Sequence, residues 1–451
     1  MTGVSRHRML LVGAVIGALV GGFLLASIPT DTHAPAAEHA PVVRTNAPPT
    51  TPSPAAVPAP TSKVRAVTEL LRRRAQAVLR RDEAAFMSTV DPKAGWGFLD
   101  AQRRLFRNLR GVPLRTWSYP LDAGEAVDVS KLPKGEDPAD ELWAPKVDLR
   151  YALSGVDALP TRKQTGYLFA RRGGDWYVES DTALHAAGVD AWRGPWDFGP
   201  CDVRYTNHGL VLSHPSGAET AQRVAAQLDD AIAAVTSVWG DEWAGRVGVL
   251  VPSGAAEMRA MVGDEFAAGS IAAVAIAASS DPHTHTATGQ RVVINPEGAS
   301  ELSDLALRVV LRHEITHIAA RGYTTDGAPM WLLEGFADYV GYRDSGLAIA
   351  KAAPDIAAKV RESGPPTGLP SDARFRSDSG QLELAYQQSW SMCRYLAERF
   401  SEATLVRLYR RVAMAGHVSA GQLDAELRSV TGASMSELVK GWRQSLRTSF
   451  G

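Results

Sequence analysis

The second half of the chain combines short apolar runs with long helical patterns. Apolar residues at a spacing of three to four predict a helix over residues 218–239 and another over 302–320. Short runs rich in β-branched residues predict strands at 203–205, 210–212, 246–251 and 290–295. After residue 302 the pattern stays helical, with loops, to the last residue. We therefore predict a mixed sheet followed by a mainly helical C-terminal half.

Residues 63–200 show a different order, in which helical patterns come first and strand-like alternation follows. Helical spacing covers 67–79 and 99–109, and alternation covers 114–119, 146–153, 165–170 and 175–179. This order predicts a small α+β domain with its helices on one face of an antiparallel sheet. It resembles the cone-shaped fold of nuclear-transport-factor-like and cystatin-like domains. Its tryptophans are interpreted as core and rim aromatics rather than as a ligand cage: Trp117, Trp143, Trp176 and Trp192.

The N-terminus carries a basic flank and then an uncharged apolar run over residues 9–28. A run of 20 residues matches the thickness of a bilayer, whereas a cleavable signal has an apolar core of only about 7–15. Because the basic flank precedes the run, we expect the rest of the chain outside the cytoplasm. We predict a single-pass anchor in the cell membrane, with cleavage and secretion as the alternative. Residues 29–62, rich in Pro, Ala and Thr, predict an extended spacer.

Composition excludes several classes of protein. Hydrophobic residues make up 45% and charged residues 22%, which is typical of a folded chain rather than a disordered one. The net charge of −1 gives no reason to expect nucleic acid, and the arginine run at 72–74 is interpreted as a solvated helix face. Two cysteines exclude a disulfide scaffold and a cysteine-based zinc finger. Cys201 and Cys393 either form a disulfide or are buried apolar residues, and both alternatives stay open.

The candidate chemistry centres on His-Glu-Ile-Thr-His at residues 313–317, inside the predicted helix 302–320. His313 and His317 lie one turn apart on the same face, so that both imidazoles can reach one cation. Glu314 lies on the adjacent face, where it approaches a water molecule rather than the metal itself. The spacing therefore predicts a metal site with Glu314 as a general base.

The next helical pattern adds two carboxylates. Glu334 follows His317 by 17 residues, which is enough for a loop and one turn of an antiparallel helix. Asp338 lies one turn later on the same face. Pro329 is predicted as the first residue of this helix, and Gly341 as its terminator. A Glu ligand beside an Asp that accepts the outer N–H of a ligand histidine is the arrangement that zinc sites use.

Taken together, H-E-I-T-H and the downstream W-L-L-E-G-F-A-D-Y resemble the gluzincin peptidases, most closely the bacterial peptidase MA-like family. The resemblance implies a zincin-type fold for residues 201–451 and one zinc ion per chain. It implies His313, His317 and Glu334 as ligands, Glu314 as general base and Asp338 as the residue that orients a ligand. The implied activity is hydrolysis of a peptide or protein substrate by a zinc-activated water.

Weaker candidates lie on both sides of these segments. In gluzincins a Tyr or His from the later region commonly stabilises the oxyanion, which suggests Tyr386; the alternative is a tyrosine packed in the helical core. His283 and His285 are interpreted as part of an exposed polar loop. Arg291 and Asn295 bracket a strand that we expect to pair with an extended peptide, as edge strands do.

A rival hypothesis is a catalytically silent module of the same fold that binds a cell-wall component or a protein partner. Inactive descendants of such enzymes usually lose the base or a ligand. Here Glu314 and all three implied ligands are present, so the sequence favours the enzyme.

Overall fold

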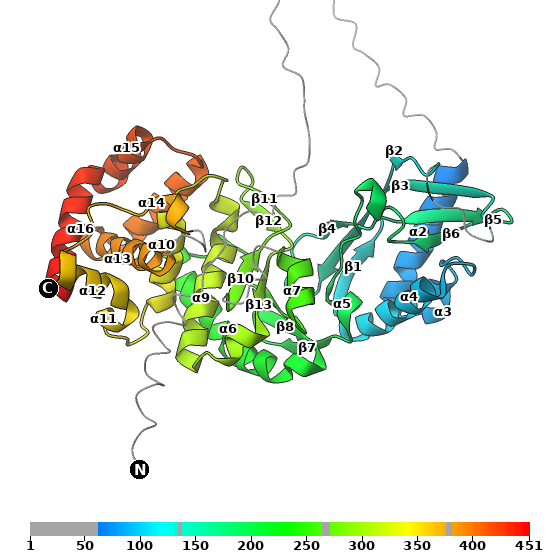
Figure 1. Ribbon diagram of the computed structural model, residues 1–451, viewed down its shortest axis with the longest axis horizontal. Helices are drawn as coiled ribbons and strands as arrows, with labels where there is room; N and C mark the ends of the chain where they lie inside the picture. Colours follow the sequence, from blue (N-terminus) through cyan, green and yellow to red (C-terminus); the bar gives the residue numbers. More distant parts are fainter. Residues whose placement is uncertain (1–61, 131, 133–137, 264–270, 376–380) are drawn as a thin grey trace, which may run out of the picture.

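The structure, a computed structural model, describes residues 62–130, 132, 138–263, 271–375 and 381–451. The predicted anchor at 1–28 and the spacer up to residue 61 lie outside these ranges. None of the helices within them combines the length and the apolar character that a membrane span needs. Two sheets lie side by side along the long axis of the molecule, each with its own helices (Figure 1). We call the two parts the first lobe (62–200) and the second lobe (201–451).

The first lobe has the predicted order of helices followed by strands. Its helices are α2 (Ser62–Arg80), α3 (Glu83–Met87), α4 (Trp96–Asn108) and α5 (Pro195–Phe198). Its strands are β1 (Leu114–Ser118), β2 (Leu121–Val127), β3 (Glu141–Leu153), β4 (Thr161–Gln164), β5 (Leu168–Arg172) and β6 (Asp175–Ser180). The long strand β3 pairs antiparallel with β1, β2, β4 and β5. Strand β2 was not predicted, and the run predicted at 165–170 is broken, because only its second part belongs to β5.

Helix α2 packs on this sheet through one apolar face, which includes Val67, Leu70 and Leu71. The interpretation of the arginine run as a solvated face is wrong for Arg74, which is fully buried. Its guanidinium binds Thr89 and Gln102 and lies 3.9 Å from the centre of the Phe86 ring. Three of the four tryptophans are buried as predicted, and Trp192 is half-buried at the rim.

The second lobe is built on a five-stranded sheet with the order β10-β13-β9-β8-β7. These strands are β7 (Asp202–Tyr205), β8 (Gly209–Ser213), β9 (Val247–Val251), β10 (Ala273–Ile276) and β13 (Arg291–Ile294). The three inner strands are parallel to one another, and both outer strands run antiparallel to their neighbours. The side chains of the three inner strands, β8, β9 and β13, are all buried, as expected for strands covered on both faces.

One expectation about this sheet is wrong. The strand predicted at 290–295 is β13, and it lies between β10 and β9 rather than at an edge. The edge strand on that side is β10, which the sequence analysis did not identify. The predicted polar loop that contains His283 and His285 is also more regular than expected, because β11 (Ser279–Asp281) and β12 (Thr286–Thr288) form a hairpin there.

The helices of the second lobe cover the sheet and then form the C-terminal half. They are α6 (Ala218–Trp239), α7 (Ala255–Val262), α8 (Pro296–Ser300), α9 (Asp304–Ala320), α10 (Met330–Tyr342), α11 (Ile349–Ala352), α12 (Pro354–Ser363), α13 (Leu382–Phe400), α14 (Glu402–Ala415), α15 (Ala420–Thr431) and α16 (Met435–Phe450). Helices α6 and α9 pack against each other beside the sheet, and α10 lies between α9 and α13. The helices predicted at 218–239 and 302–320 are thus confirmed as α6 and α9, apart from two residues at one end.

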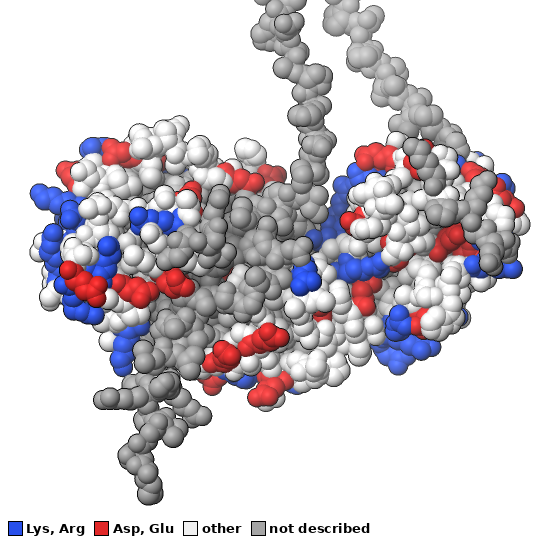
Figure 2. All heavy atoms as spheres, in the orientation of Figure 1, with Lys and Arg blue, Asp and Glu red and all other residues white. Residues whose placement is uncertain are grey.

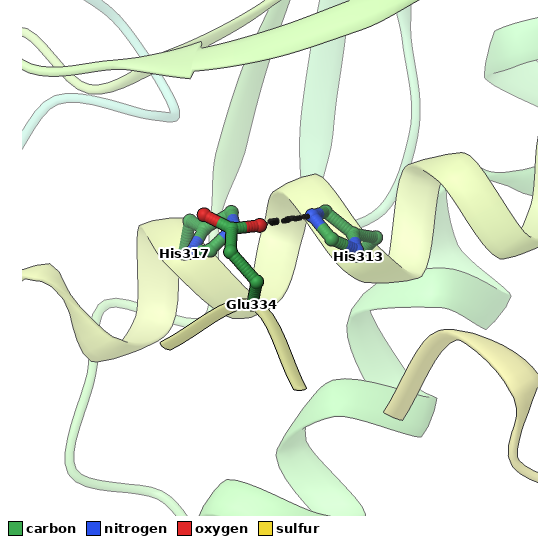
Figure 3. Close-up of side chains that lie close together, drawn as sticks. All are labelled: His313, His317 and Glu334. Carbon is green, nitrogen blue, oxygen red and sulfur yellow. Dashed lines mark hydrogen bonds and ion pairs between the residues drawn. The ribbon is translucent and has the colours of Figure 1, made fainter. Parts of the chain in front are cut away.

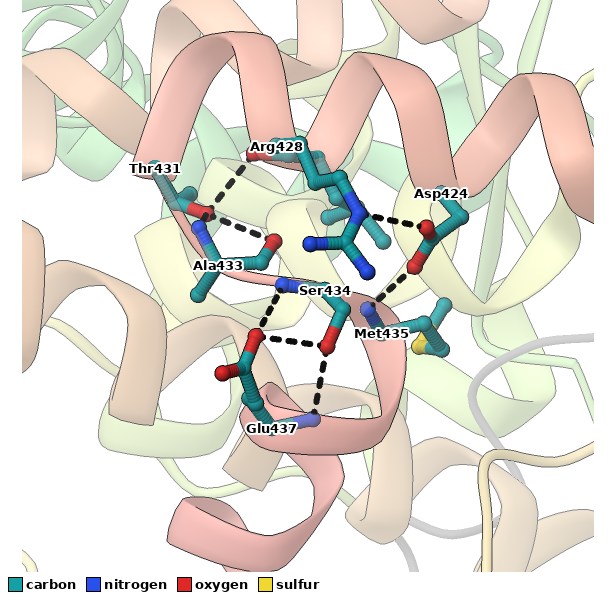
Figure 4. Close-up of polar contacts among 8 residues, drawn as sticks. Asp424, Arg428, Thr431, Ala433, Ser434, Met435 and Glu437 are labelled. Carbon is teal, nitrogen blue, oxygen red and sulfur yellow. Dashed lines mark hydrogen bonds and ion pairs between the residues drawn. The ribbon is translucent and has the colours of Figure 1, made fainter.

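The last two helices are joined by a tightly bonded turn (Figure 4). Gly432 ends α15 with a φ of 75°, a left-handed conformation that glycine adopts without strain. Ser434 and Glu437 then form a reciprocal capping box at the start of α16. Asp424 accepts the backbone N–H of Met435 at 2.6 Å, which ties the two helices together. The sequence around this turn therefore specifies where α15 ends and where α16 begins.

The two lobes share part of their hydrophobic core. One cluster contains Trp117 and Phe169 of the first lobe together with Leu212, Leu250 and Val293 of the second. The lobes are therefore packed against each other, whereas the domain boundary at residue 200 stays a prediction. Both cysteines are free and buried, which corresponds to the apolar alternative.

Candidate metal centre

Helix α9 carries the first two candidate ligands into the centre of the second lobe. Ser303 caps its N-terminus by accepting the backbone N–H of Ala306 at 3.2 Å. From His313 to Ala320 every side chain is buried, so this end of the helix is surrounded by protein. His313 and His317 are 3% and 4% exposed, and their side chains point to the same side of the helix. A buried pair of imidazoles must find polar partners there.

Helix α10 supplies the third candidate ligand and approaches both neighbouring helices closely. A Cβ atom on Gly335 would lie 2.5 Å from the carbonyl oxygen of Ser389 on α13. A Cβ atom on Gly341 would lie 3.0 Å from the carbonyl oxygen of Val309 on α9. The prediction that Gly341 terminates the helix is wrong, because α10 continues to Tyr342. Gly341 instead allows the close packing that brings Glu334 over α9.

Three ligand atoms converge between α9 and α10 (Figure 3). The Nε2 atoms of His313 and His317 lie 3.1 Å apart, and Glu334 Oε2 lies 3.3 and 3.5 Å from them. His313, His317 and Glu334 are the only group of this kind within the described residues, and their ligand atoms all lie within 4.8 Å of one another. The sequence placed these same three side chains together.

The environment of Glu334 indicates what the cluster is built to hold. Its side chain is completely buried, and neither carboxylate oxygen has a hydrogen-bond partner of good geometry among the described residues. Burial opposes its ionisation, but the neighbouring His317 and His313 outweigh that and lower the pKa of Glu334 to about 2. A buried carboxylate without such bonds is costly. A cation between the imidazoles and the carboxylate would satisfy it.

Two further carboxyl groups flank the three ligand atoms. His313 Nδ1 donates to Asp338 Oδ1 at 2.8 Å, which leaves Nε2 facing the cluster. Burial disfavours protonation of His313, but its hydrogen bond to Asp338 and the nearby carboxylate of Glu334 raise its pKa well above the usual value. Glu314 is 4% exposed, and burial raises its pKa, opposed by the two histidines. The backbone N–H of Ala275, on the edge strand β10, lies near Glu314 and favours its ionised form.

Tyr386 lies on α13, across α10 from the histidine helix, and is 5% exposed. Burial first, and then the charges of Glu334, Asp338 and Glu314, raise the pKa of its hydroxyl well above the usual value. The hydroxyl therefore stays protonated, available as a donor beside the cluster. Its ring packs edge-on against Phe375, with 5.2 Å between the ring centres.

The remaining candidates lie away from the cluster. His285 stacks on Tyr323 at 4.1 Å between ring centres, and His283 is exposed on the hairpin. Arg291 is committed to an ion pair with the first lobe, and Asn295 caps α8 by accepting the backbone N–H of Glu297. Near the cluster, the element that sequence reasoning missed is β10. The short apolar run at 271–276 was the available signal, because runs of that kind form buried strands.

The donor set fits a zinc ion. Two imidazole nitrogens and one carboxylate oxygen, all buried, match the three-ligand sets of catalytic zinc sites, in which a fourth position is left for water or substrate. The bond from His313 to Asp338 supplies the outer partner that a ligand histidine requires. The orphaned oxygens of Glu334 supply the charge that a dication needs nearby.

Comparison with known proteins finds only a weak structural similarity to solved structures. No protein-family model matches the chain, and no curated protein matches it by sequence. Among solved structures, it is similar to a mutant M1 zinc metallopeptidase of Deinococcus radiodurans, with 15% identity, a TM-score of 0.31, and coverage of 53% of this chain and 50% of that one. A form of that peptidase bound to a Tyr-Ser-Ala substrate gives 16% identity, a TM-score of 0.33, and coverage of 61% and 58%. The chain thus spans about half of the length of these proteins.

Proposed function

We propose that the chain is a zinc-dependent peptidase of the gluzincin type. The observation that carries this proposal is the buried cluster of His313, His317 and Glu334, in which the carboxylate lies 3.3 and 3.5 Å from the two imidazole nitrogens but makes no well-formed hydrogen bond within the described residues. A site that only binds a metal needs no general base. Glu314 lies beside the cluster without belonging to the ligand group, so its carboxyl can serve as a general base.

Each residue has a distinct part in the proposed reaction. His313, His317 and Glu334 would hold the zinc ion, which would lower the pKa of water towards neutrality and polarise the scissile carbonyl. Glu314 takes the proton from the attacking water and returns it to the leaving amine as the C–N bond breaks. Asp338 holds His313 in the tautomer that presents Nε2 to the cluster. The protonated hydroxyl of Tyr386 donates to the developing oxyanion.

The edge strand β10 offers a place for an extended substrate. Within the described residues it pairs on one side only, with β13. Its other edge faces Glu314 through the backbone of Ala275. A peptide that adds to this edge as a further strand would lie across the site, and its main-chain groups would satisfy those of β10.

The proposal includes a location, which comes from the sequence alone. The apolar run at 9–28 anchors the chain in the cell membrane with the N-terminus inside, and the Pro-rich segment after it carries the two lobes outside the cytoplasm. Added protease should then digest both lobes on intact spheroplasts. Protection of the lobes would contradict this orientation.

The decisive experiment for the activity is Glu314→Gln. Because Glu314 is outside the ligand group, this variant should keep its zinc, measured by elemental analysis, while hydrolysis of casein or of a proteome-derived peptide library falls about 10²- to 10⁴-fold. The exposed Glu301 provides a matched control, and Glu301→Gln should change neither quantity. If wild type and Glu314→Gln bind the same peptide and neither cleaves it, the chain is a binding module and the proposal fails.

A further inference from the structure

The edge strand β10 ends against the first lobe. Its last residue, Ile276, pairs with Arg291 at the start of β13. The guanidinium of Arg291 reaches into the first lobe and makes two hydrogen bonds with Asp157, at 2.6 and 2.7 Å. Both side chains are almost completely buried. The end of β10 is therefore fixed against the turn at residues 154–160, which joins β3 to β4.

A second contact joins the lobes at the same place. Gly289, at the base of the β11–β12 hairpin, has a φ of +61°, and a Cβ atom on it would lie 2.8 Å from both Ala278 and Thr161. Thr161 is the first residue of β4. The first lobe thus touches the second lobe immediately beyond the end of β10. A chain that leaves β10 in this direction meets the surface of the first lobe.

Two exposed arginines hold the turn at 154–160 from the outside. Arg115 donates to the carbonyl oxygens of Asp157 and Ala158, at 2.6 and 2.9 Å. Arg246, from the second lobe, donates to the carbonyl oxygen of Gly155 at 3.1 Å. These bonds are to neutral carbonyl groups, so they leave the positive charge of both side chains uncompensated.

Two more exposed arginines lie on the strands that the turn connects. Arg150 on β3 is the cross-strand partner of Arg162 on β4. Asp148 binds Arg162 at 2.5 Å, whereas no carboxylate of the described residues contacts Arg150. Like charges directly opposite each other on a sheet are unfavourable. Such an arrangement gains stability when an anion binds between them.

We call Arg115, Arg150, Arg162 and Arg246 the arginine collar. Figure 2 shows Lys and Arg side chains gathered where the two lobes meet. Among the described residues, the acidic side chains in contact with this region are Asp148 and Asp157, and each is already paired with an arginine. The collar is therefore a positive surface beside one end of the proposed substrate strand, although the whole chain has a net charge of only −1.

We propose that the arginine collar recognises Asp or Glu residues of the peptide substrate, on one side of the scissile bond only. This inference rests on the proposed peptidase function. A substrate strand on β10 passes the metal centre at Ala275 and, beyond Ile276, runs towards the first lobe, where Arg162 follows Thr161 on β4. Because the collar touches no reacting atom, it contributes to substrate binding and sets specificity.

The test compares matched fluorogenic peptides with the full-length chain. Each pair keeps the residues around a bond that the wild type cleaves in a proteome-derived library, and places either Asp or Lys on one side of it. The wild type should prefer the acidic peptide, and Arg150→Glu should lose about fivefold in kcat/KM for it, mainly through KM, as expected for one exposed ion pair and for loss of uniform binding. Added salt should weaken the preference.

Arg103→Glu is the matched control, since Arg103 is an exposed arginine on α4 and should leave the preference unchanged. Binding of the same labelled peptides to the Glu314→Gln variant, followed by fluorescence polarisation, measures recognition without turnover. Cleavage of both peptides at equal rates by wild type and Arg150→Glu would overturn the inference and leave the peptidase proposal standing. Equal binding of both peptides when neither is cleaved would overturn both. Loss of binding to anionic vesicles in Arg150→Glu, without any change in peptide preference, would show that the collar serves a membrane surface and would also overturn it.

Discussion

Two buried clusters of histidine and glutamate in the second lobe differ in how their carboxylates are satisfied. Glu257 accepts the backbone N–H of Ser253 at 2.7 Å, the Ser253 hydroxyl at 2.8 Å and His214 Nε2 at 2.9 Å. Glu334 is equally buried, but the nearest nitrogens are 3.3 and 3.5 Å away, and both belong to histidines that face each other. A complete hydrogen-bond set marks a structural pair, whereas an incomplete one marks a place for a ligand.

The histidines of the two clusters show the same contrast. His214 Nδ1 faces the carbonyl oxygen of Pro200 at 3.0 Å, and its Nε2 faces Glu257. Both neighbours of the ring are acceptors, so the imidazole binds a proton on each nitrogen. His313 has an acceptor on Nδ1, but its Nε2 faces another imidazole nitrogen as well as Glu334. In the His214–Glu257 cluster, protons on the imidazole satisfy every acceptor. In the His313–His317–Glu334 cluster, several lone pairs face one another and need a shared cation.

The largest expected effect is on zinc binding, which should depend on Glu334 and not on Glu257. Glu334→Gln should remove zinc from the chain, because a charged ligand becomes a neutral one. The wild type should gain about 4 kcal/mol of stability when free zinc is raised to a thousand times its Kd, and the variant should gain almost none. Thermal unfolding with and without zinc, together with elemental analysis, measures both. Retention of one zinc ion per chain by Glu334→Gln would show that the ligand set is wrong.

Glu257→Gln should give the opposite pattern, with normal zinc content and a less stable fold. The substitution removes the charge that balances the protonated His214, and breaking a buried pair in this way costs about 3–5 kcal/mol. Urea unfolding of the zinc-loaded protein measures the loss. A variant that unfolds at the wild-type urea concentration but loses zinc would reverse the assignment of the two clusters.

Asp338→Asn should have a smaller effect, confined to the metal centre. The amide still reaches His313 Nδ1 but no longer favours the tautomer that presents Nε2, so zinc affinity should fall about 10- to 100-fold. Competition with a chromogenic chelator measures the affinity. Asp355 serves as a control on α12, where Asp355→Asn should leave the affinity unchanged. Equal affinities for Asp338→Asn and wild type would show that His313 is oriented by its packing alone.

The sequence predicted the metal cluster better than it predicted the surrounding sheet. The helical period alone places His313 and His317 on one face, and Glu334 is brought over them by a short loop, so local spacing determines most of the cluster. The position of β10 depends instead on pairing with β13, which is a contact between strands that the sequence pattern does not encode. The role of Gly341 was missed for the same reason, because a glycine that allows close helix packing looks like a helix terminator until the neighbouring helix is known.

The sequence also did not predict which individual charged side chains are buried. Arg72 and Arg73 are exposed and Arg74 is buried, although all three occupy adjacent positions of one helix. The helical period allows this difference, but only the partners of Arg74 in the first lobe make burial tolerable. Arg291 is a similar case, since its partner Asp157 lies in the other lobe.

The smallest expected effect is a dependence of stability on pH that belongs to the complete cluster. The hydrogen bond to Glu257 raises the pKa of His214 and outweighs burial, which lowers it. The charge of Glu257, the carbonyl of Pro200 and the charge of Asp202 add to the net rise. The folded pKa therefore lies above the unfolded value of about 6.5. The imidazolium contributes stability that is complete below that pH and is lost as pH rises through the folded pKa, at about 1.4 kcal/mol for each unit of difference.

Nearby Asp197, whose pKa burial raises to about 6, loses its contribution in the same direction but at lower pH. Urea midpoints of the wild type and His214→Gln, compared from pH 6.5 upward, should therefore converge as pH rises. The groups of the metal centre are common to both proteins and cancel in the difference. Midpoints that stay equally far apart across this range would show that His214 is held by its packing and carries no charge when folded.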